Sequence, residues 1–163
     1  MRATRLNHVS IHAVDMEASL RFYTELLGLE RIPSPTFQHR VEWLRLGDQQ
    51  LHLFERDTEA PSFHHVAFEV DDFEAVYAKT RELEIQEGEA WSSSARELPD
   101  GSVQLYLRDP AGNLVEIDWP DASTLDRSIV TDLKRLEDDV PQLADARSAS
   151  LFLGRRTAPS PTG

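Results

Sequence analysis

Cysteine is absent from this chain of 163 residues, and so are long apolar runs. Without cysteine the chain can form no disulfide, bind no metal through a thiolate and use no cysteine nucleophile. No stretch approaches the roughly 18 uninterrupted apolar residues of a membrane-spanning helix. The N-terminal segment also lacks the apolar core of a secretory signal, so we expect a cytoplasmic protein.

Basic residues are outnumbered: 29 Asp and Glu against 17 Lys and Arg give a formal net charge of −12. Such a surface repels phosphate groups, which argues against nucleic acid and anionic membrane as partners. Hydrophobic residues make up 40% of the chain, enough for one domain or for two small modules that share a core. A small-molecule substrate remains the expected partner, since its pocket requires only a few well-placed groups.

An internal repeat organises the chain. The segment HVSIHAVD that begins at His8 aligns with HVAFEVDD beginning at His65, at a constant offset of 57 residues. Both copies indicate a β-strand followed by a helix with an aspartate N-cap. The two helices are expected over about residues 16–27 and 73–83, and a repeat of this size indicates duplicated units with a shared core.

Strand-rich stretches with turn residues follow each helix. Strands are expected at residues 40–46 and 50–55 in the first half and at 102–107 and 114–119 in the second. Each half therefore has the pattern β-α-β-β-β. We predict an α+β fold of two paired βαβββ modules, residues 1–57 and 62–120, which form a half-barrel cavity.

Residues 121–163 follow a different pattern. Apolar residues recur at helical spacing from Leu125 to Val140, after a capping sequence that begins at Ser123. This predicts a C-terminal amphipathic helix that ends before Pro141 and packs on the sheets or on a partner subunit. The last residues are rich in Pro, Gly and Ser, which is typical of a flexible tail.

Polar side chains interrupt the apolar pattern at repeat-equivalent strand positions. His8 and His65 begin the first strand of each half, and His52 and Glu116 each stand between two apolar residues on the last strand. If the sheets curve around a common cavity, these four side chains converge. Imidazole and carboxylate groups together bind divalent transition metals such as Zn, Ni, Mn, Co or Fe, and we predict one such ion here. The other histidines are expected to face solvent: His12, His39 and His64.

The same segments resemble the vicinal oxygen chelate superfamily, which includes glyoxalase I, methylmalonyl-CoA epimerases, extradiol dioxygenases and bleomycin-resistance proteins. The resemblance covers about residues 5 to 120, through NHVSIHAVD, FYTELLGLE, HVAFEVDD and DPAGNLVEI in that order. It implies a glyoxalase-like fold, a homodimer and metal ligands at His8, His52, His65 and Glu116. It also implies that Asp109, Pro110 and Gly112 form the turn that positions Glu116.

The leading function implied by the resemblance is a metal-dependent lyase or isomerase of glyoxalase type. Such an enzyme stabilises an enediolate of a small oxygen-chelating substrate during proton transfer, with Glu116 as both metal ligand and catalytic base. Arg45, Tyr106 and Trp43 are the candidate substrate-binding residues.

Two alternatives remain open. Glyoxalase I usually carries Glu or Gln where this chain has His52, whereas extradiol dioxygenases bind Fe²⁺ through two His and one Glu, a set that His8, His65 and Glu116 would supply. A metal-free drug-binding protein of the bleomycin-resistance type is the third class, although such members lack the ligand residues that this chain retains. The sequence does not identify the substrate or the metal.

Overall fold

The computed structural model describes residues 2, 5–88 and 93–154. Its elements repeat the order β-α-β-β-β, which confirms the predicted α+β class. Contacts divide the chain into two compact units. One holds the residues up to Val66 together with Leu107–Val115, and the other holds Ala67–Tyr106 together with the residues from Glu116 on. The predicted module boundaries, 1–57 and 62–120, stay a prediction.

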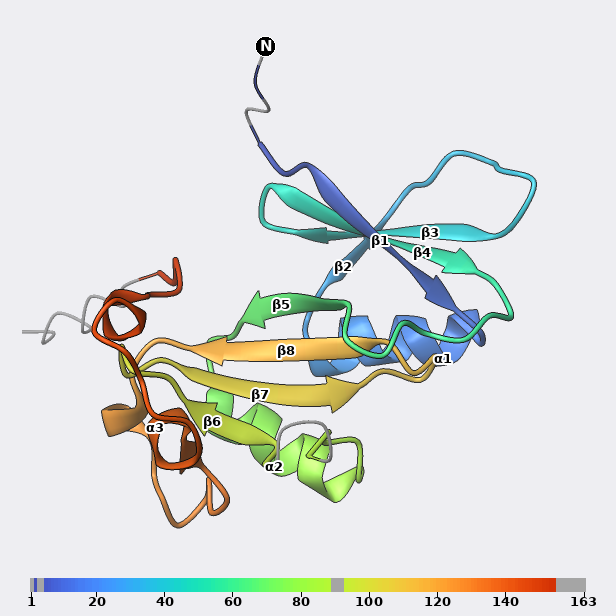
Figure 1. Cartoon of the computed structure of the whole chain (residues 1–163). Helices are drawn as coiled ribbons and strands as arrows, with labels where there is room; N and C mark the ends of the chain where they lie inside the picture. Colours follow the sequence, from blue (N-terminus) through green and yellow to red (C-terminus); the bar gives the residue numbers. More distant parts are fainter. Residues whose placement is uncertain (1, 3–4, 89–92, 155–163) are drawn as a thin grey trace, which may run out of the picture. The chain divides into compact units, whose positions relative to one another are not determined.

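The first sheet has the strand order β1-β4-β3-β2 (Figure 1). Its strands are β1 (His8–Ala13), β2 (Glu30–Ile32), β3 (Val41–Leu46) and β4 (Gln49–Glu55). β1 is parallel to β4, and β3 is antiparallel to both of its neighbours. Gly47, with φ 57°, makes the tight β3–β4 turn, a backbone conformation that glycine adopts without steric cost. The parallel pairing places the first and last strands of the half side by side, as the repeat requires.

The first helix begins where the sequence predicts. Asp15 caps α1 (Met16–Arg21) by accepting a 3.0 Å hydrogen bond from the backbone N–H of Ala18. The helix continues as a π-helical turn, η1 (Phe22–Leu26), and Gly28 follows with φ 69°. The predicted helix over residues 16–27 is confirmed, with its last turn wider than expected.

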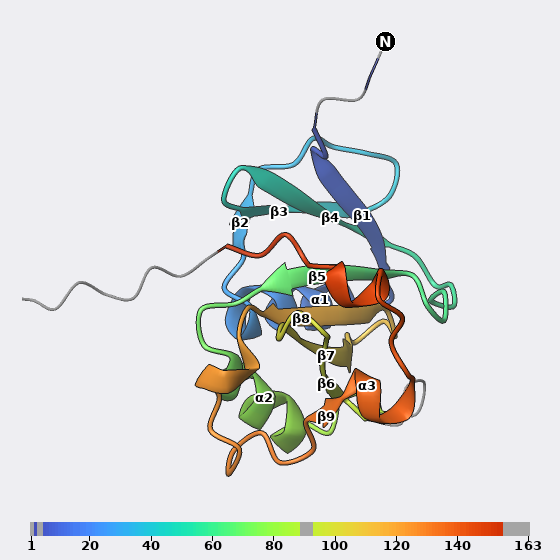
Figure 2. The same ribbon diagram turned by 60° about the vertical axis from the view of Figure 1, so that its left-hand side comes forward.

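The second sheet has the order β5-β8-β7-β6-β9 (Figures 1 and 2). Its strands are β5 (His65–Glu69), β6 (Ala95–Glu97), β7 (Val103–Arg108), β8 (Leu114–Trp119) and β9 (Lys134–Arg135). Helix α2 (Phe73–Glu82) starts at Asp72, which accepts a hydrogen bond from the N–H of Ala75. In the part of the chain that the structure describes, no helix is long and apolar enough to cross a membrane.

The continuous C-terminal helix predicted before Pro141 is not formed. In its place lie the short helix η2 (Ala122–Thr124), turns, β9 and the four-residue helix α3 (Leu136–Asp139). Leu125 and Leu133 are buried, whereas Val140 is 52% exposed, so the apolar residues do not share one helical face. Lys134 and Arg135 instead pair with β6, because β6 offers an open strand edge with unpaired backbone groups. The short helix η3 (Ala146–Ser148) follows, and the predicted flexible tail lies outside the described residues beyond Gly154.

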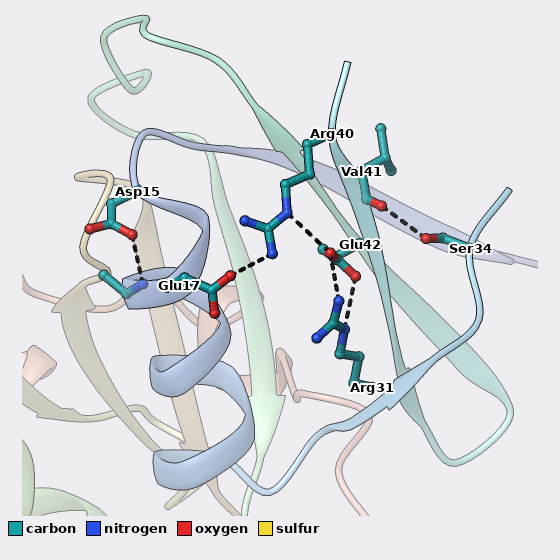
Figure 3. A network of polar contacts seen from close by, with 8 residues as sticks. Asp15, Glu17, Arg31, Ser34, Arg40, Val41 and Glu42 are labelled. Carbon is teal, nitrogen blue, oxygen red and sulfur yellow. Dashed lines mark hydrogen bonds and ion pairs between the residues drawn. The ribbon is translucent and has the colours of Figure 1, made fainter. Parts of the chain in front are cut away.

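A buried carboxylate holds the first sheet together (Figure 3). Glu42 is only 7% exposed and accepts two hydrogen bonds from the Arg31 guanidinium, at 2.9 and 2.7 Å. Arg40 also contacts Glu42, at 3.2 Å, and extends to Glu17 on α1. The network therefore links β2, β3 and the first helix.

Glu42→Gln is expected to lower the free energy of unfolding by about 1–2 kcal/mol, because a carboxamide cannot accept both guanidinium hydrogen bonds. Urea denaturation checks this value. The matched control is Glu30→Gln, since the Glu30–Arg45 pair has side chains 60% and 55% exposed and should change stability by less than about 0.5 kcal/mol. Equal effects of the two substitutions would contradict the role given to Glu42.

Candidate functional site

Two of the predicted ligands meet on one face of the first sheet. Side chains on alternate strand residues share a face, and the β1–β4 and β3–β4 registers place Ser10 and Trp43 on either side of His52. The His8 and His52 rings are stacked, with centroids 4.2 Å apart and planes at 17°. His52 is 6% exposed, whereas the His8 side chain is exposed to solvent. The contact with the buried His52 ring therefore restricts the orientation of the exposed His8 ring.

Hydrogen bonds fix the tautomers of His8 and His65. Nδ1 of His8 lies 2.9 Å from Oδ1 of Asn7, and Nδ1 of His65 lies 3.0 Å from the backbone carbonyl oxygen of Phe63. Because both partners are oxygen acceptors, each Nδ1 carries the proton and each neutral ring holds its lone pair on Nε2. Metal-binding histidines characteristically donate the second ring N–H to such an oxygen.

His52 is oriented differently. Its Nε2 donates to Oε1 of Gln50 at 2.9 Å, so the lone pair of the neutral ring is on Nδ1. Burial, followed by the charge of His8, lowers the pKa of His52. Both effects favour the neutral imidazole, which is the form that binds a metal. The donor chemistry of all three histidines therefore fits a divalent transition metal.

The candidate pocket residues Trp43 and Arg45 lie on the same face as His52. The Trp43 ring is stacked on the His52 ring, with centroids 4.5 Å apart and planes at 7°. The centroid of the Phe37 ring, in the loop between β2 and β3, lies 6.5 Å from that of Trp43. Arg45 is exposed and ion-paired with Glu30 on β2. Trp43 thus packs against the predicted ligand His52, whose other side is stacked on His8. Arg45 lies near the end of β3, and its side chain is exposed to solvent.

Glu116 lies in a buried group of polar side chains on the second sheet. It is 3% exposed, accepts a hydrogen bond from Nε2 of Gln104 on β7, and also hydrogen-bonds Tyr106. Asp118, two residues further along β8, is 5% exposed and hydrogen-bonds Glu116. The structure places Tyr106, a candidate substrate-binding residue, beside Glu116. Sequence reasoning missed Asp118, although the two-residue strand period places it on the face of Glu116.

Burial raises the pKa values of two side chains beside Glu116, those of Asp118 and Tyr106. Desolvation, then the hydrogen bond and charge of Glu116, raise the pKa of Asp118 to about 8. Burial and the charge of Glu116 also raise the pKa of Tyr106. Burial beside Glu116 therefore favours the protonated form of Asp118.

Asp118→Asn is expected to change how stability depends on pH. The folded pKa of about 8 lies above the ordinary value of 3.8, so this group favours folding fully below pH 3.8 and loses that contribution as pH rises to 8. An amide cannot ionise, and in EDTA at pH 8.5 the variant should be more stable than the parent by on the order of 2 kcal/mol. Urea denaturation at pH 5 and 8.5 measures the slope. The exposed control Asp57→Asn should retain the parental slope, and an unchanged slope in Asp118→Asn would contradict the protonated state.

A pocket of about 260 Å³ lies beside His65 in the first unit. Its polar lining is Ser10, His12, His64, His65 and Asn113. None of the lining residues that the structure describes carries a carboxylate, in a chain with 29 acidic residues. His12 was expected to face solvent, but it is half-buried and its Nε2 is buried without a hydrogen-bond partner among the described residues. The pocket is therefore small and free of the negative charge found elsewhere.

The four predicted ligands are divided between the two compact units, and the complete set stays a prediction. His8, His52 and His65 belong to the first compact unit and Glu116 to the second. Among residues 2, 5–88 and 93–154, no three His, Asp or Glu side chains are arranged to hold a metal ion. The structure pairs His8 with His52, and places Glu116 with Asp118.

A family model matches residues 5–117, a range that includes both repeats and the predicted ligands His8, His52, His65 and Glu116. The chain belongs to the Glyoxalase/Bleomycin resistance protein/Dioxygenase superfamily. The match ends at residue 117, one residue after Glu116 on β8, so the C-terminal elements from η2 to η3 lie beyond the superfamily domain.

Relatives in this superfamily include enzymes with different reactions. The chain is 28% identical to human mitochondrial methylmalonyl-CoA epimerase over 134 residues, which cover 70% of this chain and 73% of the epimerase. It is 25% identical to the crystal structure of lactoylglutathione lyase from Agrobacterium tumefaciens, with a TM-score of 0.56 and coverage of 72% and 94%. The structure of the oxidase ChaP-H2 is 26% identical, with a TM-score of 0.58 and the same coverage. These comparisons confirm the glyoxalase-like fold predicted from the sequence.

Proposed function

We propose that this protein is a divalent-metal-dependent isomerase or lyase that moves a proton on the carbon next to a carbonyl group of a small substrate. One observation carries the proposal. The repeat-equivalent histidines His8 and His65 each donate Nδ1–H to an oxygen and hold a lone pair on Nε2, the arrangement of a metal-binding imidazole.

The site residues would have separate roles in such a reaction. His8, His52, His65 and Glu116 would hold the ion, which when bound would polarise a substrate oxygen and acidify the adjacent C–H bond. Glu116 would accept the proton, since Gln104 fixes its carboxylate in a water-poor environment. Asp118, with its pKa raised by burial, would hold a further proton beside Glu116.

The pocket beside His65 supports a small substrate, because 260 Å³ is below the size of a typical drug-binding site. Its lack of carboxylates would admit an acyl group or an enolate without charge repulsion. The named substrates of two relatives, methylmalonyl-CoA and lactoylglutathione, are both thioesters with a C–H bond beside the carbonyl. A small acyl thioester is therefore the substrate class that we propose.

Deuterium exchange tests the function directly. Chelator-treated protein is reloaded with Mn²⁺, Co²⁺ or Zn²⁺ and incubated in D₂O with methylmalonyl-CoA or lactoylglutathione, and ¹H NMR follows the C–H beside the thioester. We expect exchange that requires metal and falls at least about 100-fold in Glu116→Gln. The exposed variant Glu30→Gln is the matched control. Exchange that is equally fast in EDTA would overturn metal dependence, and no exchange with either thioester would overturn the substrate class.

One observation favours a second candidate, oxygenative cleavage at Fe²⁺. The His52 ring is held between His8 and Trp43 and donates Nε2–H to Gln50. Without His52, the remaining set is two histidines and one carboxylate, which is the set of non-haem Fe²⁺ oxygenases. Oxygen consumption with Fe²⁺ and catechol, unchanged in His52→Ala, would support this candidate over proton transfer.

A further inference from the structure

Residues 134–154 lie beyond the superfamily match and pack on the second compact unit. Strand β9 extends the sheet by pairing in parallel with β6, Lys134 opposite Arg96 and Arg135 opposite Glu97. The chain then continues through α3 and η3 towards β5, the strand at the other edge of the same sheet (Figure 2). There the Gly154 N–H donates a 2.9 Å hydrogen bond to the carboxylate of Glu69 on β5. The segment therefore spans the width of the sheet.

The contacts show which face the segment crosses. Alternation along β8 places Glu116 and Asp118 on one face and Trp119 on the other. The Trp119 ring lies 6.3 Å from Phe73 of α2, so α2 covers the face opposite Asp118.

Both ends of the segment attach to the Asp118 face. Asp139 of α3 lies 3.6 Å from the guanidinium of Arg96, which pairs with Gln104 of β7, the residue that donates to Glu116 on this face. At the other end Gly154 binds Glu69, whose charge acts on Asp118. The chain between these two attachments thus passes over the face that carries the buried acids.

Residues 134–154 have few buried contacts, whereas Glu116 and Asp118 on the sheet face that they cross are buried. None of residues 134–154, all of them described, is buried, and Leu143 and Phe152 are 79% and fully exposed. Beyond β9 and the ion pair of Asp139 with the buried Arg96, residues 140–154 attach through hydrogen bonds such as Leu151 N–H to Asp100 at 3.2 Å. Segments with few buried contacts open at low free-energy cost, whereas Asp118 beneath is only 5% exposed.

We propose that residues 140–154 form a lid, closed in this structure over the face that carries Glu116 and Asp118, which opens to admit solvent and substrate to these acids. The proposal does not depend on which reaction the site performs. It concerns access to the acids, and the closed lid would exclude water from them.

Because the chain has no cysteine, one introduced thiol can report access. Gln104→Cys places a thiol on the Asp118 face, and its rate of reaction with a small disulfide reagent is compared with and without residues 140–163. We expect at least a tenfold faster reaction after truncation. A thiol at Asp57→Cys, in an exposed loop of the other unit, should react equally fast in both. Equal Gln104→Cys rates in the two folded proteins would overturn the lid.

A full-length pair decides the question if the truncated chain fails to fold, which circular dichroism would reveal. Glu69→Ala removes the acceptor of the Gly154 N–H, whereas Glu69→Gln keeps an oxygen acceptor at the same place. In the Gln104→Cys background we expect about a threefold faster thiol reaction for Glu69→Ala than for Glu69→Gln. The same rate in both would show that this attachment does not hold a lid closed.

Discussion

Replacing His65 with alanine is expected to lower the affinity of the protein for Mn²⁺ or Co²⁺ at least about 100-fold. The Phe63 carbonyl fixes the tautomer of His65, so the ligand atom is already oriented before the metal binds. Alanine removes that atom, and a water would have to replace it. Isothermal titration of chelator-treated protein at pH 7.5 measures the change.

Variants of the other predicted ligands define the set. His8→Ala and Glu116→Ala should weaken binding to a similar extent, since both are assigned the same role. His52→Ala decides between three and four protein ligands: a loss equal to that of His65→Ala makes it a ligand, and a loss below about tenfold makes it a support for the His8 ring. His39→Ala, on an exposed loop, is the control. Unchanged affinity in His65→Ala would contradict the proposed centre.

Features with a local cause could be predicted from the sequence. The aspartates at positions 15 and 72 cap helices because their side chains reach N–H groups three residues ahead, an interaction within one turn. Strand alternation similarly identified Glu116 as a polar residue between two apolar strand residues, and the structure places it on β8 with 3% exposure. The repeat then related the two halves without knowledge of any long-range contact.

Features that depend on distant contacts could not be predicted in this way. The apolar spacing from Leu125 to Val140 suits a helix. Lys134 and Arg135 instead form a strand, because they pair with the open edge of β6. Local periodicity contains no information on such an edge. His12 was misjudged for the same reason, since its burial comes from residues of the pocket that are far away in sequence.

Asp109→Ala is expected to lower the free energy of unfolding by about 3–4 kcal/mol, because its carboxylate joins three segments of the first unit. The side chain is 4% exposed and accepts hydrogen bonds from the Tyr23 hydroxyl at 2.8 Å and from the Asn113 backbone and side-chain N–H groups, both at 2.8 Å. Asn113 in turn donates to the backbone carbonyl of His12 at 2.8 Å. Alanine would leave these donors buried without an acceptor. Urea denaturation measures the loss.

The size of this loss also tests whether the turn that precedes β8 positions Glu116. Tyr23→Phe removes only one hydrogen bond and should cost about 1 kcal/mol, while leaving the turn intact. Asp57→Ala, in an exposed loop, is the matched aspartate control and should cost less than Asp109→Ala. If Asp109 acts through the turn, a folded Asp109→Ala protein should also bind Mn²⁺ more weakly, whereas Tyr23→Phe should bind it as the parent does. Loss of stability with unchanged Mn²⁺ affinity would confine Asp109 to a structural role.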